Sequence, residues 1–177
     1  MAQASGYKLP PQAVVDIIDA APAPGVSFSP NREWVLLVDR DAMPDIEDVS
    51  RRMLALAGMR IDPISNGSFQ TSFNRGITLS KREDLAKNNK SSIRIELPDD
   101  VKISRISWSH NSKYFSFAVV TDQGQQLWVA AVDDPTPRLL TNRLNTIMAG
   151  PRWLPNGKQM LCLLVPENYG SEPAPAK

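Results

Sequence analysis

The residue types that most often carry enzyme chemistry are few in this chain of 177 residues, and their spacing argues against catalysis. A hydrolase serine nucleophile stands in a G-x-S-x-G turn, which needs two glycines four residues apart. None of the nine glycines has that spacing, and their positions also exclude the G-x-G-x-x-G and Walker loops that bind phosphate. The sequence therefore predicts no catalytic residue and no cofactor in this chain.

The remaining reactive side chains are more typical of structure than of chemistry. A Ser-His-Asp triad needs a histidine to accept the serine proton. The single histidine, His110, lies in a predicted turn, where we expect a structural or solvent-facing role. Cys162 lies in the apolar segment 160–165, so we expect it to be buried rather than activated. The carboxylate pairs Asp99–Asp100 and Asp133–Asp134 adjoin prolines, which is typical of turns, and no metal site is predicted.

Charge and aromatic content exclude two classes of partner. With 20 basic and 19 acidic residues, the net charge of +1 provides no field for nucleic acid or an anionic membrane. The longest apolar stretches have five or six residues, whereas a membrane helix needs about 20. No secretory leader is recognisable, so we expect a cytoplasmic protein. Without a basic groove for base stacking, we expect core packing for the four tryptophans: Trp34, Trp108, Trp128 and Trp153.

Three segments align without gaps and indicate a structural repeat. They begin at residues 26, 106 and 151, and each has a short strand with an aromatic residue, a turn and a second apolar strand. We expect the aromatic residue to anchor its strand, and the turn asparagine to tolerate a left-handed backbone. The aligned positions are Phe28, Trp108 and Trp153 in the strand and Asn31, Asn111 and Asn156 in the turn.

The spacing of the repeats predicts an all-β fold built as a partial β-propeller. The last two aromatic positions are 45 residues apart, which is the period of one propeller blade, whereas the first two are 80 apart. We attribute the excess to an insertion in blade one. The prediction is about two and a half four-stranded antiparallel blades: blade one over 26–97, blade two over 103–141 and the start of blade three over 151–165.

Helices and connections complete the predicted organisation. Residues 1–25 hold a short amphipathic helix from residue 12 to 19 and a Pro/Ala linker, and we expect the helix to dock on the segment after the linker. The insertion contains a predicted helix over 44–57, with an interior stripe. The stripe consists of Ile46, Val49, Met53 and either Leu56 or Ala57. Blade one is predicted to end with strands near 71–79 and 91–97, joined by an exposed loop, and residues 166–177 form a Pro-rich flexible tail.

Two and a half blades cannot close a ring, because propellers close with roughly 4 to 8. An open ring leaves an apolar strand edge unpaired. We therefore expect either the front portion of a longer protein or a module that completes its sheet by self-association or with a partner.

Several strings, in order along nearly the whole chain, resemble one family. Residues 7–11, Tyr-Lys-Leu-Pro-Pro, followed by Val-Asp-Ile-Ile-Asp-Ala at 15–20, resemble the start of the glutamyl endopeptidase branch of prolyl oligopeptidase-type serine peptidases. The same branch is resembled by Leu-Ala-Gly-Met-Arg-Ile-Asp at 56–62, by Ile-Ser-Trp-Ser at 106–109 and by Leu-Asn-Thr-Ile at 144–147 leading to Trp153.

The resemblance implies a large enzyme in which an N-terminal propeller covers a C-terminal α/β-hydrolase domain with a Ser-Asp-His triad. In that family the propeller restricts which peptides reach the nucleophile. This chain would match the first third of the propeller, and its partners would be the hydrolase domain and the peptide substrates. Gln70 follows the Asn-Gly of residues 66–67 where the family pattern has an arginine, and no ligand-contacting residue is identified. The alternative is a stand-alone β-rich protein-binding module.

Overall fold

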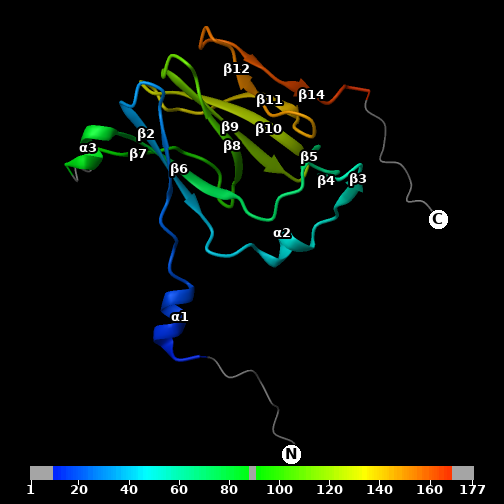
Figure 1. Cartoon of the computed structure of the whole chain (residues 1–177), viewed down its shortest axis with the longest axis horizontal. Coiled ribbons are helices and arrows are strands. Elements are labelled where there is room, and N and C mark those ends of the chain that lie inside the picture. The colour runs from blue at the N-terminus through cyan, green and yellow to red at the C-terminus, as the bar shows by residue number, and fades with distance from the viewer. Residues whose placement is uncertain (1–9, 88–90, 169–177) are drawn as a thin grey trace, which may run out of the picture.

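The computed structural model describes residues 10–87 and 91–168 and is mostly β (Figure 1). Its main feature is a nine-stranded sheet made of two antiparallel four-stranded meanders and one further strand. The meanders are joined by one residue pair, Asn74 with Ile103. No helix within the described residues is long and apolar enough to cross a membrane.

The first meander consists of strands with mainly apolar and β-branched residues. They are β1 (Gly25–Phe28), β2 (Trp34–Arg40), β6 (Asn74–Lys81) and β7 (Ile93–Arg94), each antiparallel to its neighbour. The last two lie near the strands expected at 71–79 and 91–97. The loop between them begins with a short helix that the sequence did not predict, α3 (Arg82–Ala86). Residues 41–73, between β2 and β6, are called the insertion below.

The second meander confirms the antiparallel strands expected over 103–141. It consists of β8 (Lys102–Trp108), β9 (Tyr114–Thr121), β10 (Gly124–Ala131) and β11 (Arg138–Asn145). The turn between β9 and β10 contains Asp122 and Gln123, and Gly124 has a φ of 137°, which favours glycine.

The third repeat departs from its predicted continuous strand over 160–165. Strands β12 (Arg152–Trp153) and β13 (Met160–Leu161) pair with each other, but β14 (Leu163–Leu164) pairs with β11. The chain changes partner at Cys162, and β14 extends the main sheet beyond β11. With no strand of the described residues covering them, Leu161, Leu163 and Leu164 stay exposed.

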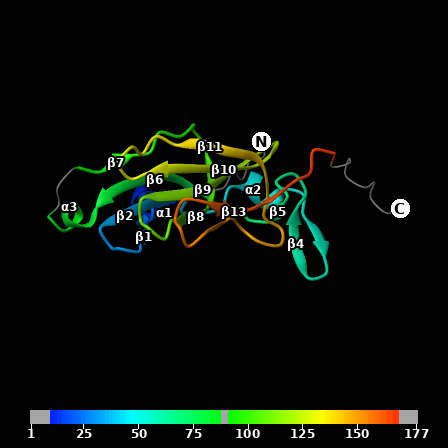
Figure 2. The same cartoon turned by 90° about the horizontal axis from the view of Figure 1, so that it is seen from above.

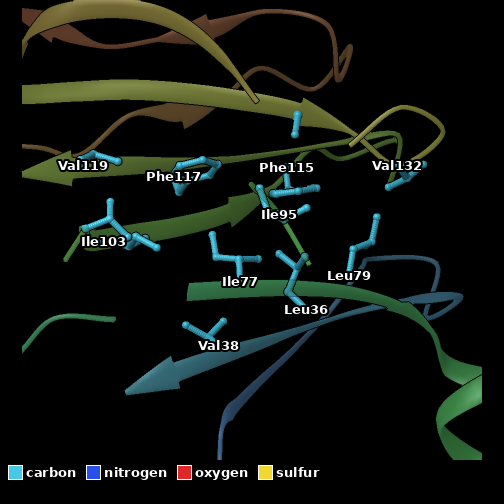
Figure 3. Close-up of a cluster of buried hydrophobic side chains, with 12 residues drawn as sticks. Leu36, Val38, Ile77, Leu79, Ile95, Ile103, Phe115, Phe117, Val119 and Val132 are labelled. Atoms are coloured by element: carbon cyan, nitrogen blue, oxygen red, sulfur yellow. The ribbon is translucent and has the colours of Figure 1, made fainter. Parts of the chain in front are cut away.

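The two meanders pack face to face around the main hydrophobic core. Alternate residues of a strand point to opposite faces, so each strand presents every second side chain to this core. Figure 3 shows the β2 and β6 side chains directed toward those of β8 and β9. The first group contributes Leu36, Val38, Ile77 and Leu79, and the second contributes Ile103, Phe115, Phe117 and Val119.

The aromatic residues of the second and third repeats pack against the preceding meander, whereas Phe28 of the first repeat does not. Trp108 packs on the core between the meanders and meets Phe115 edge-on, with ring centroids 5.6 Å apart. Trp153 packs on the second meander, stacked on Tyr114 at 6.2 Å. Each aromatic thus covers the preceding meander. The anchoring role expected for Phe28 is wrong, because it is 53% exposed and no meander precedes it within the described residues.

The N-terminal helix forms as predicted but does not dock. It is α1 (Gln12–Ile18), stabilised by a 2.7 Å hydrogen bond from Gln12 Nε2 to Asp16 Oδ1. Figure 1 shows it well apart from the sheet. Its apolar residues, Val14, Ile17 and Ile18, are therefore exposed.

The helix predicted over 44–57 is too long. The structure has only α2 (Ile46–Ser50) there, capped by Asp45 Oδ1, which accepts from the Glu47 amide at 2.9 Å. The helix ends because Arg51 turns to extended backbone, with a ψ of 148°. The chain then forms a small sheet of β3 (Leu54–Leu56), β4 (Met59–Asp62) and β5 (Gly67–Ser68).

The expected interior stripe of that helix is also wrong. Its four residues are exposed, and the buried residue of α2 is instead Asp48. Part of the apolar pattern that suggested a helical period of 3.6 residues lies in β3. In a strand, successive side chains point to opposite faces, so this pattern does not form one stripe.

The face-to-face packing predicts unequal effects for one substitution at two sites. Phe117→Ala, at a fully buried position, should lower the free energy of unfolding by about 3–5 kcal/mol. Phe28→Ala, at a half-exposed position, should lower it by less than about 1 kcal/mol. Urea unfolding followed by tryptophan fluorescence measures both, and equal losses would contradict the stacking of the meanders.

Candidate functional site

The turns of the first two repeats have the same hydrogen-bond network, and each network is centred on a buried serine. Ser29 Oγ donates to Asn31 Oδ1 at 2.7 Å and accepts from the Trp34 amide at 3.0 Å. The second turn repeats this, with Ser109 Oγ 2.8 Å from Asn111 Oδ1 and 2.9 Å from the Tyr114 amide. The network satisfies backbone groups that the turn removes from water.

The turn asparagines act through their side chains, which differs from the expected left-handed backbone. The left-handed residue is the next one in every repeat: Arg32 with a φ of 59°, Ser112 with 59° and Gly157 with 64°. The asparagine oxygen instead accepts a backbone amide two residues on, at 3.1 Å for Lys113 and 3.0 Å for Lys158. This is an Asx-turn, which gives asparagine its preference there.

Successive turns also touch one another across long separations in sequence. The Asn31 amide donates to Ser112 Oγ at 3.0 Å, and Asn111 Nδ2 donates to the Gly157 carbonyl at 3.2 Å. Two of the three predicted asparagines are thus joined to the following repeat. Asn156 bonds within its own turn, to Lys158 and Gln159. The serines were missed in the sequence, although the shared Ser-x-Asn spacing of the first two repeats marks them.

A cluster of charged side chains holds the insertion against the opposite end of the sheet. At its centre is Asp48, whose side chain is 2% exposed. Lys102 Nζ lies 2.7 Å from its Oδ1, Arg51 Nε lies 3.4 Å from the same oxygen, and Arg75 Nη2 lies 3.6 Å from Oδ2. Because Arg75 is on β6 and Lys102 begins β8, Asp48 ties the insertion to both meanders.

Arg51 extends this cluster into the insertion itself. Its Nη1 pairs with Asp62, and its Nη2 donates to the Gln70 carbonyl at 2.6 Å. Its guanidinium lies 5.5 Å from the ring centroid of Phe69 and 5.3 Å from that of Phe73. Gln70, where the family pattern has an arginine, therefore contributes its backbone to the cluster.

A second attachment joins the insertion to the second meander. The Thr146 amide donates to the Asn66 carbonyl at 2.9 Å, and Thr146 Oγ1 donates to Gln125 Oε1 at 3.0 Å. A Cβ on Gly67 would lie 2.3 Å from Gln125 Nε2, so a larger residue here would displace the Gln125 side chain.

An open cavity of about 670 Å³ lies between the second meander and the third repeat. Its lining is mainly apolar and includes Trp153 and Cys162, with Arg138 and Lys158 also present. Trp153 Nε1 donates to Ser116 Oγ at 3.1 Å, which fixes the indole on the second meander. Cys162 is half-buried here rather than fully buried as expected.

The other side chains considered for chemistry are not brought together. His110 is exposed in the turn of the second repeat. Asp134 Oδ1 accepts from the Thr136 hydroxyl at 2.7 Å, and this bond holds the pKa of the exposed carboxyl below its usual value. Within residues 10–87 and 91–168, no three His, Cys, Asp or Glu side chains gather as metal ligands would.

The sequence is similar to part of two longer plant proteins. A protein of Oryza sativa subsp. japonica named "Probable glutamyl endopeptidase, chloroplastic" is 32% identical over 178 residues, covering 95% of this chain. A protein of Arabidopsis thaliana with the same name is 32% identical over 182 residues, covering 98% of the chain. The chain is a homologue of glutamyl endopeptidases. It spans 19% of the length of each of these two. No protein-family model matches the sequence.

Two solved peptidase structures resemble this one at low sequence identity. The Pyrococcus horikoshii acylaminoacyl peptidase has a TM-score of 0.47 and 15% identity, covering 82% of this chain and 17% of its own. A Bacteroides ovatus protein described as a dipeptidyl aminopeptidase IV has a TM-score of 0.40 and 16% identity, covering 66% of this chain and 16% of its own.

The charged cluster predicts a large effect for one carboxylate. Asp48→Asn removes the carboxylate that three cations share, whereas Arg51 keeps Asp62 and Arg75 keeps Asp41. The free energy of unfolding should therefore fall by about 1.5–3 kcal/mol, mainly through the contact with Lys102. The control is Asp39→Asn, which removes the exposed ion pair with Arg94 and should cost less than about 1 kcal/mol. Urea unfolding compares them, and a loss at Asp48 no larger than at Asp39 would refute the central role of Asp48.

The contact between turns predicts a difference between two glycines. Gly157→Ala requires a left-handed alanine and places its Cβ 2.5 Å from Asn111 Cγ. Gly58→Ala also has a positive φ, but no atom lies within 4 Å of the added Cβ. We expect Gly58→Ala to lower stability by about 1–2 kcal/mol and Gly157→Ala by more.

Asn111→Ala separates the two contributions, because it should reduce the loss caused by Gly157→Ala and leave that of Gly58→Ala unchanged. Thermal unfolding of the single and double variants provides the comparison. An additive result at 111 and 157 would show that the turns do not constrain each other.

Proposed function

We propose that this chain is the N-terminal β-propeller part of a glutamyl endopeptidase-like serine peptidase. Its role is to restrict the peptides that reach a C-terminal α/β-hydrolase domain outside these 177 residues. The chain is not catalytic alone, and the peptide substrates are those of the whole enzyme. The predicted cytoplasmic location remains a prediction, since the names of the two plant relatives place them in the chloroplast.

The observation that carries the proposal is the repeated stacking of the meanders, together with the 32% identity to the two plant endopeptidases. Phe115 and Phe117 of β9 face the first meander. The equivalent positions of β2, 80 residues earlier, are Val35 and Leu37, on the same face as Phe28. Val35 is already buried, but Val26 and Phe28 on this face are exposed. This apolar outer face is therefore suited to receive a preceding sheet, as in a closed ring. Two and a half blades, with blade three only begun, fit the first part of such a ring.

A second candidate function rests on the open apolar faces at both ends of the stack. Val26 and Phe28 are exposed at one end, and Leu161 and Leu163 at the other. A stand-alone binding module could cover both by self-association, head to tail. The alternative is that a different partner protein covers them. A discrete oligomer of the purified chain in analytical ultracentrifugation supports this candidate, and a poorly folded or aggregating monomer counts against it.

The size of the native polypeptide tests the proposal. An antibody against the chain should detect a band several times heavier than the 19.6 kDa of these residues. The purified 177-residue chain should not cleave peptides after glutamate, whereas the native protein should, and a serine-directed phosphonate should inhibit that cleavage. A native band at 20 kDa alone, or cleavage by the purified chain, would refute the proposal.

A further inference from the structure

The tip of the β3–β4 hairpin has a composition that does not suit a solvent-exposed turn. It consists of residues 56–59, Leu-Ala-Gly-Met, with Leu56 62% exposed and space around Gly58. Figure 2 shows the hairpin projecting from the body of the molecule. Exposed two-residue hairpin turns usually carry Asn-Gly or Asp-Gly, whose polar residues favour both water and a positive φ. This tip carries four nonpolar residues in sequence.

The backbone of Ala57 is also unusual for a solvent-exposed turn. Its φ is 48° and that of Gly58 is 80°, so both turn residues are left-handed. An L-alanine in this region is strained by roughly 1–2 kcal/mol, which asparagine or aspartate would reduce. An alanine is compatible with this turn where the tip is covered and a polar side chain would be desolvated.

More exposed apolar residues lie in the same insertion. Met43, Ile46, Val49 and Met53 are 70%, 79%, 49% and 39% exposed. Within α2, Ile46 and Val49 are three residues apart and therefore share one helix face. This face points away from the sheet, because the buried residue of the helix is Asp48.

The insertion presents these residues on a fixed support. Asp48 binds cations of β6 and β8, Arg51 binds Asp62 and the Gln70 carbonyl, and Asn66 joins the end of β11. These attachments place the hairpin at the end of the sheet opposite the repeat turns. Val26 and Phe28 lie elsewhere, on the outer face of the first meander.

From these observations we infer that the hairpin tip and the exposed face of α2 form a docking surface for the catalytic part of the same, longer polypeptide. This inference rests on the proposed function. The occupant follows from length and placement. Most of each relative lies outside the 19% that the chain spans. Further blades of the proposed ring would pack on the outer faces of the stacked sheets, whereas the hairpin lies at one end of the strands and so faces the catalytic part. The insertion is thus a fixed contact that sets the catalytic part against one end of the stacked sheets.

Site-specific photo-crosslinking in the full-length native polypeptide tests the docking surface. Benzoylphenylalanine replaces Leu56 in one variant and Arg60 in the other, which lies on the opposite face of the same hairpin and is exposed. After irradiation, we expect position 56 to link to a peptide of the α/β-hydrolase part of the same molecule. Position 60 should give at least ten-fold less of that product.

Two outcomes would overturn the inference while leaving the proposed function intact. One is a product at position 56 that links two copies of the polypeptide, or that links position 56 to another blade of the propeller. The other is no more intramolecular product at 56 than at 60 in an active enzyme. Failure of the proposed function is seen separately, as a native band at 20 kDa with no longer polypeptide.

An activity measurement adds an independent readout. Leu56→Asp in the full-length protein should lower peptide cleavage at least ten-fold, while Arg60→Asp should change it less than two-fold. In the 177-residue chain, Leu56→Asp should leave the melting temperature unchanged, because the side chain is exposed there. Unchanged cleavage by the Leu56→Asp enzyme would contradict docking at this tip.

Discussion

Burial of one meander face by the face of the next is the constraint on which the rest of this structure depends. Phe115 and Phe117 are fully buried because the first meander lies over them, and that meander supplies Leu36 and Ile77 to the same core. The contact between the first two turns and the Asp48 cluster presuppose this arrangement, since each of them involves groups from both meanders. The same packing explains why Phe28, with no preceding sheet, remains exposed.

The polar contacts act at the two ends of that core. At one end, the serine-centred turns touch in succession and satisfy backbone groups. At the other end, Asp48 gathers cations from both meanders near the single residue pair that joins them. A buried carboxylate is unfavourable unless it is paired, so this cluster makes the position of the insertion specific. The apolar core supplies burial, and the ends determine the relative placement of the sheets.

The sequence predicted the repeating parts of this fold well, because the three aligned segments could be compared with one another. Alternation and the equivalence of Trp108 and Trp153 located the strands of the second meander within a few residues. The insertion was misread, because Arg51 leaves the helix for contacts with Asp62 and Gln70 that no local pattern encodes. The turns were located correctly, but Ser29 and Ser109 were overlooked, since their role depends on hydrogen bonds within a folded turn. The exposure of Phe28 was not predicted either, because it depends on whether another sheet packs against the first meander.

The contact between Asn111 and Gly157 makes the repeating units non-interchangeable. The first junction uses the hydroxyl of Ser112, whereas the second has room only for a residue without a Cβ. Tandem duplication of the second unit would bring a serine to the place that Gly157 occupies. Its Cβ would then lie 2.5 Å from the Cγ of the asparagine in the preceding turn. The order of the units is therefore encoded in their turns. Recombination that exchanges whole units would have to change these turn residues together with the strands.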